Sequence, residues 1–119
     1  MRENRPWGWY ETIEEHYYTE HHRAGFKVKK IGVHSHKRLS LQKHRQRSEH
    51  WVILTGKAKV RVGDDEHILF RNQSVYIPTG TLHRIENVGD EPLEFIEVQI
   101  GDYLDEDDIE RIEDDFGRV

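Results

Sequence analysis

The chain of 119 residues contains no cysteine and no long apolar run. Without cysteine it has neither disulfides nor thiolate chemistry, which is typical of a cytoplasmic protein. Its apolar stretches are too short to span a membrane. The N-terminal Met-Arg-Glu-Asn-Arg also lacks the apolar core of a signal peptide. These absences favour a cytoplasmic protein without a membrane partner.

Clustered positive charge, which nucleic-acid binding requires, is also scarce. The chain has 18 Lys and Arg against 23 Asp and Glu, a formal charge of −5, and its basic residues form no continuous stripe. We therefore expect no nucleic-acid partner. A chain of this length with 34% hydrophobic residues is expected to form one domain with a modest core.

Alternation of apolar and polar residues predicts several short β-strands. Residues 26–29, 58–62 and 93–100 alternate in this way, and turns rich in Gly, Asp and Asn separate the segments. Short strands joined by such turns are typical of a sandwich or barrel. The sequence thus predicts a single all-β domain over residues 1–119.

Both ends of the chain differ from this pattern. Residues 1–24 mix aromatic and charged side chains without a clear period, so we expect an arm that packs its rings against a barrel core at 25–100. The acidic segment 101–119 is expected to contain a short helix, beginning within residues 102–115, because carboxylates favour a helix N-terminus.

Four side chains in two separate segments suit a single divalent metal. Gln42 and His44 are two residues apart and face the same side of a strand. Glu49 opens a run of strand-forming residues, and His83 follows the tight corner at residues 78–80. Two imidazoles, one carboxylate and one amide oxygen could hold Zn²⁺, Mn²⁺, Co²⁺, Ni²⁺ or Fe²⁺ and leave positions open for substrate.

The alternative is a polar barrel interior without metal. A buried carboxylate beside two imidazoles is costly unless it is paired or bound to metal, so metal binding is favoured. His34 and His36 have the same spacing but no acidic residue at a suitable distance. His21 and His22 lie in the arm, where we expect solvated side chains.

Arg47 and Arg38 are placed to bind a phosphate group. Arg47 lies in the turn between two expected ligands, and Arg38 shares the expected ligand face of its strand. Arginine offers bidentate donors to phosphate. The alternatives are that Arg38 caps the barrel end and that Arg47 pairs with a surface acid. Glu97 and Gln99 share one face of the last long strand, which either lines the pocket or is solvated.

The order of these residues resembles the pair of motifs of the cupin family. The first motif is His44, four residues, Glu49, six residues and Gly56; the second is Pro78-x-Gly80-x-x-His83-x-x-x-Asn87. The resemblance implies a double-stranded β-helix, or jelly-roll, barrel.

Three positions depart from the cupin pattern. His36 and Asn72 stand where each motif would open with glycine, and Gln42 replaces the usual first histidine. The glycine changes are mild, because Asn tolerates left-handed backbone and a turn can be built without glycine.

A more specific resemblance is to type II phosphomannose isomerase. It rests on RLSLQKH and RSEHW, on Arg5-Pro6-Trp7-Gly8 upstream and on EVQIGDYLDEDDIERIEDDFGR downstream, and so covers residues 5–118. In that family this domain is usually the C-terminal part of a bifunctional enzyme whose N-terminal part makes GDP-mannose. No glycine-rich sugar-nucleotide loop precedes the domain in this sequence, so we do not expect GDP-mannose synthesis from it.

The resemblance implies a metal-dependent aldose–ketose isomerase that interconverts mannose 6-phosphate and fructose 6-phosphate through an enediol. It implies a catalytic role for Arg47. From their positions we expect Arg38 to bind the phosphate, and we expect Glu97 to carry the proton because partial desolvation raises the pKa of a carboxylate. One alternative is a non-catalytic metal-binding cupin that recognises a sugar phosphate or nucleotide sugar. An Fe²⁺-dependent oxygenase is another. We also expect a homodimer, because exposed barrel strands benefit from a partner.

Overall fold

The computed structural model of the chain describes residues 1–18 and 24–119. Within these ranges it contains eleven strands and no helix, and hence no helix that is long and apolar enough to cross a membrane. The strands are β1 (Arg2–Arg5), β2 (Gly8–Tyr17), β3 (Gly25–Val33), β4 (Leu41–Lys43), β5 (Arg47–Thr55), β6 (Ala58–Val62), β7 (Asp65–Leu69), β8 (Ser74–Ile77), β9 (His83–Asn87), β10 (Leu93–Gly101) and β11 (Glu110–Glu113).

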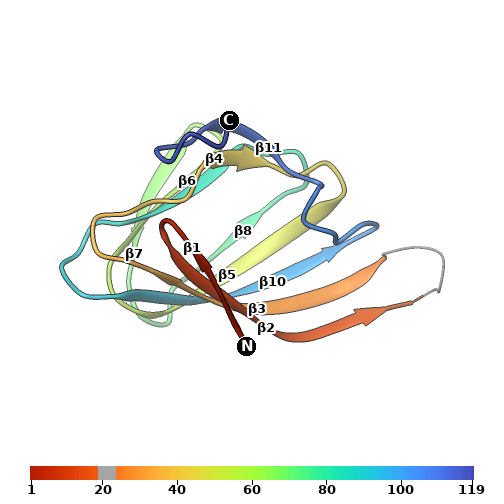
Figure 1. The fold of residues 1–119 in the computed structure, drawn as a ribbon, viewed down its shortest axis with the longest axis horizontal. Helices are drawn as coiled ribbons and strands as arrows, with labels where there is room; N and C mark the ends of the chain where they lie inside the picture. The colour runs from red at the N-terminus through yellow and green to blue at the C-terminus, as the bar shows by residue number, and fades with distance from the viewer. Residues whose placement is uncertain (19–23) are drawn as a thin grey trace.

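The strands form two antiparallel sheets that enclose the interior (Figure 1). One sheet has six strands in the order β1-β2-β3-β10-β5-β8, and the other has five in the order β11-β4-β9-β6-β7. The prediction of an all-β fold is therefore confirmed. The strands expected at 58–62 and 93–100 are β6 and β10, almost residue for residue.

The sequences of β5 and β10 make one end of the interior apolar and the other polar. Along β5 the inward side chains change from Glu49 to Trp51 and then Ile53, and all three are buried. Because β10 runs antiparallel to β5, Phe95 lies beside Ile53 and Gln99 lies beside Glu49. Apolar side chains thus fill one end, and polar groups gather at the other. The rest of the core comes from both sheets: Ile31, Val33, Ala58, Val60, Ile77, Ile85 and Leu93.

The segment that we expected to be an arm contributes two strands to the larger sheet. β1 and β2 form a hairpin, and β2 pairs with β3 over almost its whole length. Trp7, in the turn of the hairpin, is buried in the core. Residues 19–23, including His21 and His22, lie outside the described residues.

The helix predicted in the acidic segment is wrong. Residues 110–113 form β11, which pairs with the edge of β4. Local helix preference is weak and is overridden when a sheet edge supplies backbone partners. The acidic side chains are used in contacts with the barrel: Asp115 accepts two hydrogen bonds from Arg38, and Asp108 accepts from the backbone of Arg45 and Gln46.

Two turns adopt left-handed backbone without glycine. His36 has a φ of 62° and Asn72 a φ of 70°, and among the described residues they are the non-glycine positions with positive φ. These are the two positions where the cupin motifs would open with glycine. The prediction that both turns can form without glycine is confirmed.

A pair of substitutions at Asn72 tests this turn. A Cβ atom in left-handed backbone clashes with the following carbonyl, and Asn reduces the penalty by local hydrogen bonding. We expect Asn72→Ala to lower the free energy of unfolding by about 1 kcal/mol and Asn72→Gly to leave it equal or higher. Urea denaturation measures both. Equal stability of the Ala and Gly variants would contradict a left-handed requirement here.

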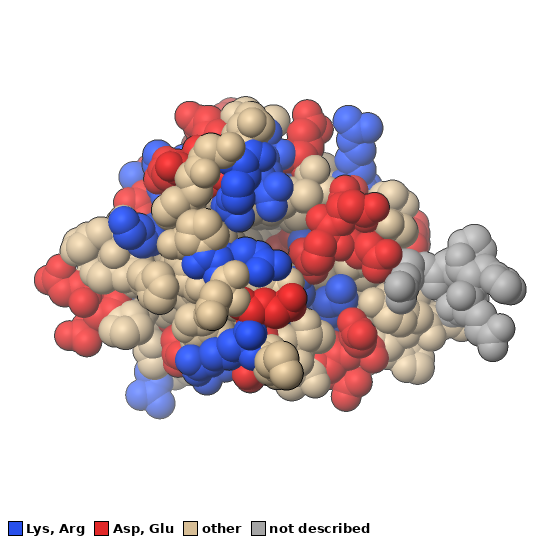
Figure 2. Space-filling view, viewed as in Figure 1, with Lys and Arg blue, Asp and Glu red and all other residues tan. Residues whose placement is uncertain are grey.

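One face of the molecule has a hollow near its centre, between the two sheets (Figure 2). Lys and Arg side chains border this hollow, and Asp and Glu side chains gather along one side of it (Figure 2). The hollow therefore offers both signs of charge to a ligand.

Candidate functional site

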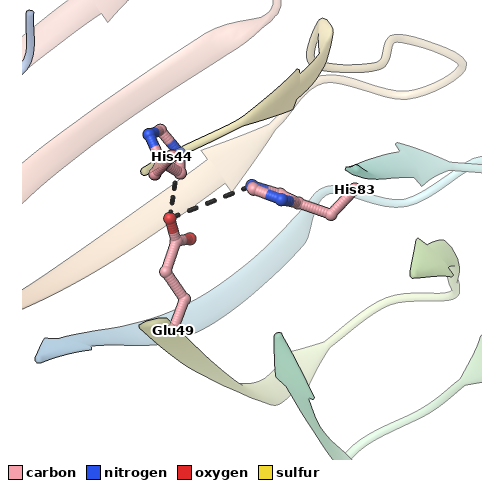
Figure 3. A group of neighbouring side chains, drawn as sticks. All are labelled: His44, Glu49 and His83. Atoms are coloured by element: carbon pink, nitrogen blue, oxygen red, sulfur yellow. Dashed lines mark ion pairs between the residues drawn. The ribbon is translucent and has the colours of Figure 1, made fainter. Parts of the chain in front are cut away.

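Both sheets contribute to a buried cluster of three possible metal ligands (Figure 3). His44 directly follows β4 and His83 begins β9, both in the five-stranded sheet, whereas Glu49 lies on β5 in the six-stranded sheet. One potential ligand atom from each residue lies within 4.8 Å of the others. The structure thus brings together three of the four side chains that we expected to bind metal.

The separations within the cluster suit a single ion. Glu49 Oε2 lies 3.0 Å from His44 Nε2 and 3.9 Å from His83 Nε2. Figure 3 shows the two rings approaching the same carboxylate oxygen. Ligand atoms about 2.0–2.2 Å from a tetrahedral Zn²⁺ are roughly 3.3–3.6 Å apart. The observed distances span that range.

The hydrogen bonds of the two imidazoles point their lone pairs into the cluster. Nδ1 of His44 donates to the carbonyl oxygen of Asp108, and Nδ1 of His83 donates to that of Thr81 at 2.9 Å. A neutral ring that donates from Nδ1 carries its lone pair on Nε2. Backbone carbonyls commonly orient metal-binding histidines in this way. Lone pairs that face a carboxylate oxygen repel it, and positive charge between them relieves this; Arg47 Nη2, 3.1 Å from His44 Nε2, supplies some, and a bound cation would supply more.

Gln42 lies at the edge of the same cluster. It pairs with His83 across β4 and β9 and lines a small cavity of about 20 Å³ with the three clustered residues. A water-sized group needs about 10–15 Å³, so this cavity has room for one ion or water. The Gln42 amide nitrogen donates to Ser40 Oγ at 3.1 Å. The amide oxygen of Gln42, which would be the atom that binds metal, is therefore not the atom that bonds to Ser40.

Arg47 is a permanent positive partner inside the cluster. Its side chain is buried and donates to Glu49 Oε2 at 3.2 Å and to His44 Nε2 at 3.1 Å. Burial acts against ionisation of Glu49, yet His44, His83 and Arg47 together hold the pKa of this carboxyl well below its ordinary value. Burial also lowers the pKa of His83, which favours the neutral ring that a metal needs. The contact with His44 and the charges of His83 and Arg47 thus act together to keep Glu49 ionised.

Glu97 lies beside Glu49 and behaves in the opposite way. The indole Nε1 of Trp51 donates to both carboxylates, at 3.0 Å to Glu49 Oε1 and at 3.1 Å to Glu97 Oε2. Gln99 donates to the other oxygen of Glu97. Burial, and after it the neighbouring Glu49, raises the pKa of Glu97 to about 8. Two adjacent carboxyls thus differ in protonation at neutral pH, and the face of β10 that carries Glu97 and Gln99 is buried rather than solvated.

The pKa of Glu97 predicts a pH dependence of stability in chelator-treated protein. Because the folded pKa lies near 8 and the ordinary value is 4.5, the folded state binds more protons between these pH values. The free energy of unfolding should therefore fall with rising pH from about 4.5 towards 8, with a slope approaching about 1.4 kcal/mol per pH unit from this group. Urea denaturation across this range measures the slope. A Glu97→Gln protein with an unchanged slope would contradict this assignment.

A larger cavity of about 120 Å³ adjoins the cluster. The two cavities share part of their walls, namely Leu39, Gln42, Arg47 and Glu97. A ligand in the larger cavity would therefore contact Arg47 and Glu97 directly, and its inner end would face the metal ligands. The larger cavity is also rich in basic side chains: Arg5, Lys29, Arg47, Arg111 and Arg118.

The structure does not bring Arg38 to this site. Arg38 lines a separate pocket on the outer side of the five-stranded sheet and forms a salt bridge of 2.7 Å with Asp115. Arg38 forms a β-bridge with Glu86, and Gln42 pairs with His83. The chain therefore advances four residues from Arg38 to Gln42 while the opposite strand advances three residues, from Glu86 to His83. This extra residue reverses the side of the sheet, as in a β-bulge. The expected position of Arg38 on the ligand face is therefore wrong.

Asp108 is a positioning residue that sequence reasoning missed. Its carbonyl oxygen accepts from His44, and its carboxylate accepts from the backbone N–H groups of Arg45 at 3.2 Å and Gln46 at 3.0 Å. It thereby fixes the turn between His44 and Glu49. Asp108 stands in the acidic segment in which we expected a short helix, and nothing local to it signals this contact.

Removing the Asp108 carboxylate should weaken metal binding. We expect Asp108→Ala to lower metal affinity by about 10–100-fold, since groups that orient metal ligands typically have effects of this size. The control is Asp102→Ala, which alters an exposed acid in the same segment. Competition with a chromogenic chelator measures both affinities. Equal affinities would show that the Asp108 side chain does not position His44.

Curated relatives match nearly the whole chain but are much longer proteins. The xanthan biosynthesis protein XanB of Xanthomonas campestris is 49% identical over 97% of this chain and 23% of its own length. The alginate biosynthesis protein AlgA of Pseudomonas aeruginosa is 48% identical over 97% of this chain and 22% of its own length. The mannose-1-phosphate guanylyltransferase ManC of Salmonella typhimurium is 44% identical over 97% of this chain and 22% of its own length. The chain therefore spans less than a quarter of these relatives.

These relatives correct the function that we predicted from the sequence. We expected a self-contained enzyme that interconverts mannose 6-phosphate and fructose 6-phosphate, or else a non-catalytic binder of a sugar phosphate or nucleotide sugar. The same domain occurs inside longer proteins, some of which are named for a different reaction, guanylyl transfer to mannose 1-phosphate. Likeness over this domain therefore does not assign the interconversion to this chain. Nor does the extent of the chain exclude nucleotidyl transfer by a longer protein.

Solved structures and a family model agree on the fold. A Klebsiella pneumoniae protein with a double-stranded β-helix domain has a TM-score of 0.74 at 16% identity, covering 92% of this chain and 88% of that one. The capsular polysaccharide assembling protein CapF of Staphylococcus aureus has a TM-score of 0.75 at 18% identity, covering 95% and 31%. The predicted double-stranded β-helix of the cupins is thus confirmed. The family model "Mannose-6-phosphate isomerase C-terminal" matches residues 1–114, and the chain belongs to that family of cupin domains.

Proposed function

We propose that this chain is the isomerase-like domain of a protein that processes mannose phosphates, and that its cavity carries out metal-assisted proton transfer on a phosphorylated sugar. The observation that carries the proposal is the shared cavity wall. A possible metal cluster, a buried arginine and a carboxyl that is protonated at neutral pH all face one space. The matching family model, named for mannose-6-phosphate isomerase, favours a mannose phosphate as the kind of ligand.

The metal would be held by His44, Glu49 and His83, with Gln42 as the fourth side chain. Mixed nitrogen and oxygen donors suit Zn²⁺, Mn²⁺, Co²⁺, Ni²⁺ or Fe²⁺. A divalent ion at this place would supply Lewis-acid polarisation of the sugar oxygens. The predicted metal site is thus a proposal supported by the burial and spacing of its ligands.

Glu97 is the group proposed to exchange a proton with the sugar. It lines both cavities, and Trp51 and Gln99 hold its two oxygens in place. A carboxyl with a pKa near neutral can both accept a proton and return it. The buried aromatic side chains of Trp51 and Phe95 keep bulk water from the inner side of the site.

Arg47 is proposed to stabilise negative charge on the sugar oxygens. Two of its nitrogens bind Glu49 and His44, whereas Nη1 has no hydrogen-bond partner in the part of the chain that is described. A fixed donor aimed at developing charge typically accelerates such a step by about 10²–10³-fold.

Substitution of Arg47 tests the proposed chemistry. We expect Arg47→Met to slow the exchange of a sugar C–H proton for deuterium by about hundredfold while one metal ion per chain is retained. Proton NMR in D₂O with phosphorylated aldoses and ketoses measures the exchange, and elemental analysis counts the metal. The matched control is Arg71→Met, at an exposed arginine away from both cavities. Equal exchange by the two variants would contradict the role of Arg47.

We propose a cytoplasmic setting for this activity, in keeping with a chain that lacks cysteine. The homodimer and the absence of nucleic-acid and membrane partners stay predictions.

A further inference from the structure

The larger cavity contains unsatisfied hydrogen-bond donors. Among the described residues, three buried side-chain nitrogen or oxygen atoms have no hydrogen-bond partner, and two of them are Arg47 Nη1 and Arg111 Nε. Both arginines line this cavity. A buried donor without an acceptor is unfavourable by about 1–3 kcal/mol, more for a charged group. A ligand with several acceptor oxygens would satisfy both.

The basic side chains of this cavity are only partly neutralised by carboxylates. Lys29 forms a salt bridge with Glu106, and Arg118 forms one with Asp114 at 2.7 Å. Neither Arg5 nor Arg111 forms a salt bridge within the described ranges of the chain. Arg5 instead donates to the Asn4 carbonyl and to the hydroxyl of Tyr10.

Arg111 also experiences the charge of its basic neighbours. Burial, followed by the charge of Arg118, lowers the pKa of Arg111; Arg5 acts in the same direction, whereas Asp114 and Glu106 act against it. Arginines that crowd together in this way repel one another unless an anion lies between them. The excess positive charge therefore favours an anionic ligand over a neutral one.

We infer that Arg5 and Arg111, which come from opposite ends of the chain, form a subsite for the phosphoryl group of the ligand at the mouth of the larger cavity. This inference rests on the proposed function, since it assigns the phosphate end of the same ligand. Arginine binds phosphate oxygens in a bidentate manner, which suits both guanidinium groups. Arg118 lines the same cavity, with its charge paired to Asp114.

The donors lie at successive depths from the surface to the metal cluster. Arg5 is exposed, Arg111 is half-buried and Arg47 is buried against Glu49. Because the larger cavity shares Arg47 and Glu97 with the small one, a phosphate held at its mouth leaves the rest of the ligand facing the cluster. The volume of about 120 Å³ exceeds several-fold the about 10–15 Å³ that one water needs.

The two terminal strands acquire a role from this arrangement. Arg5 ends β1 and Arg111 lies in β11, the outermost strands on one side of their sheets. The sequence alone predicted an arm with aromatic side chains and a short helix for these segments. In the structure they bring two arginines to one cavity, so both ends of the chain complete the anion site.

Calorimetric titration with inorganic phosphate and with mannose 6-phosphate tests the subsite, with mannose as the ligand that lacks a phosphate. We expect Arg111→Gln and Arg5→Gln each to weaken binding of both phosphates by about 10–100-fold, the effect of losing a charge-assisted hydrogen bond. Binding of mannose should be unchanged. The control Arg71→Gln should bind like the wild-type chain.

The outcomes separate the subsite from the proposed function. If neither Arg111→Gln nor Arg5→Gln weakens phosphate binding, the subsite is overturned. The proposed function would still stand if the wild-type chain binds metal and exchanges sugar protons. If phosphate binding depends on these arginines but no metal binds, the subsite stands and the proposed function fails. Using two variants guards against one of them failing to fold, because Arg5 is exposed and its replacement disturbs no buried contact.

Discussion

Glu49→Gln is expected to abolish the stabilisation of this protein by divalent metal. Glu49 Oε2 is the atom that both His44 and His83 approach, and its carboxylate is the sole acid among the clustered ligands. An amide oxygen carries no charge and holds a divalent ion far more weakly than a carboxylate. A wild-type chain with metal at a hundred times its dissociation constant should gain about 2.7 kcal/mol in free energy of unfolding. The variant should gain none.

The same substitution should also destabilise the chelator-treated protein. Arg47 is buried and its salt-bridge partner is Glu49. Removing one partner of a buried ion pair leaves an uncompensated charge, which typically costs about 3–5 kcal/mol. Glu91→Gln, at an exposed acid, is the matched control and should leave both quantities unchanged. A Glu49→Gln protein whose thermal midpoint still rises with added metal would contradict the metal assignment.

Glu97→Gln should remove proton exchange while leaving metal binding intact. The amide oxygen of Gln can still accept from Trp51 Nε1, but the amide cannot take up and return a proton. Loss of a positioned acid–base group typically slows such a reaction by about 10²–10⁴-fold. Deuterium exchange followed by proton NMR measures the rate, and elemental analysis should still find one metal per chain.

A matched control for Glu97 lies on the same strand. Glu94 also belongs to β10 but is only half-buried and lies 3.8 Å from Lys30. Glu94→Gln should therefore exchange sugar protons at the wild-type rate. If Glu97→Gln retained more than about half of that rate, another group would have to carry the proton.

Local pattern was sufficient to predict several of the strands and the closeness of three of the expected metal ligands. Strict alternation placed β6 and β10, and the spacing of His44, Glu49 and His83 predicted that their side chains lie in the interior of the barrel. These features depend on the two-residue period of a strand and on the turns between strands. Both can be seen in short windows of sequence.

Features that depend on distant partners could not be predicted in this way. The side of the sheet on which Arg38 lies depends on one extra residue before β4, opposite β9. The strand β11 depends on the free edge of β4, and Asp108 reaches residues more than sixty positions earlier. Such contacts depend on tertiary packing, which overrides weak local preferences.

The most direct test of the account is deuterium incorporation into phosphorylated aldoses and ketoses by the wild-type chain, with and without metal. After chelation and reloading with Zn²⁺, Mn²⁺, Co²⁺, Ni²⁺ or Fe²⁺ in turn, proton NMR in D₂O should show loss of a sugar C–H signal next to the carbonyl carbon with at least one metal. The chelated chain should show none. Unchanged spectra with all five metals would contradict metal-assisted proton transfer in this cavity.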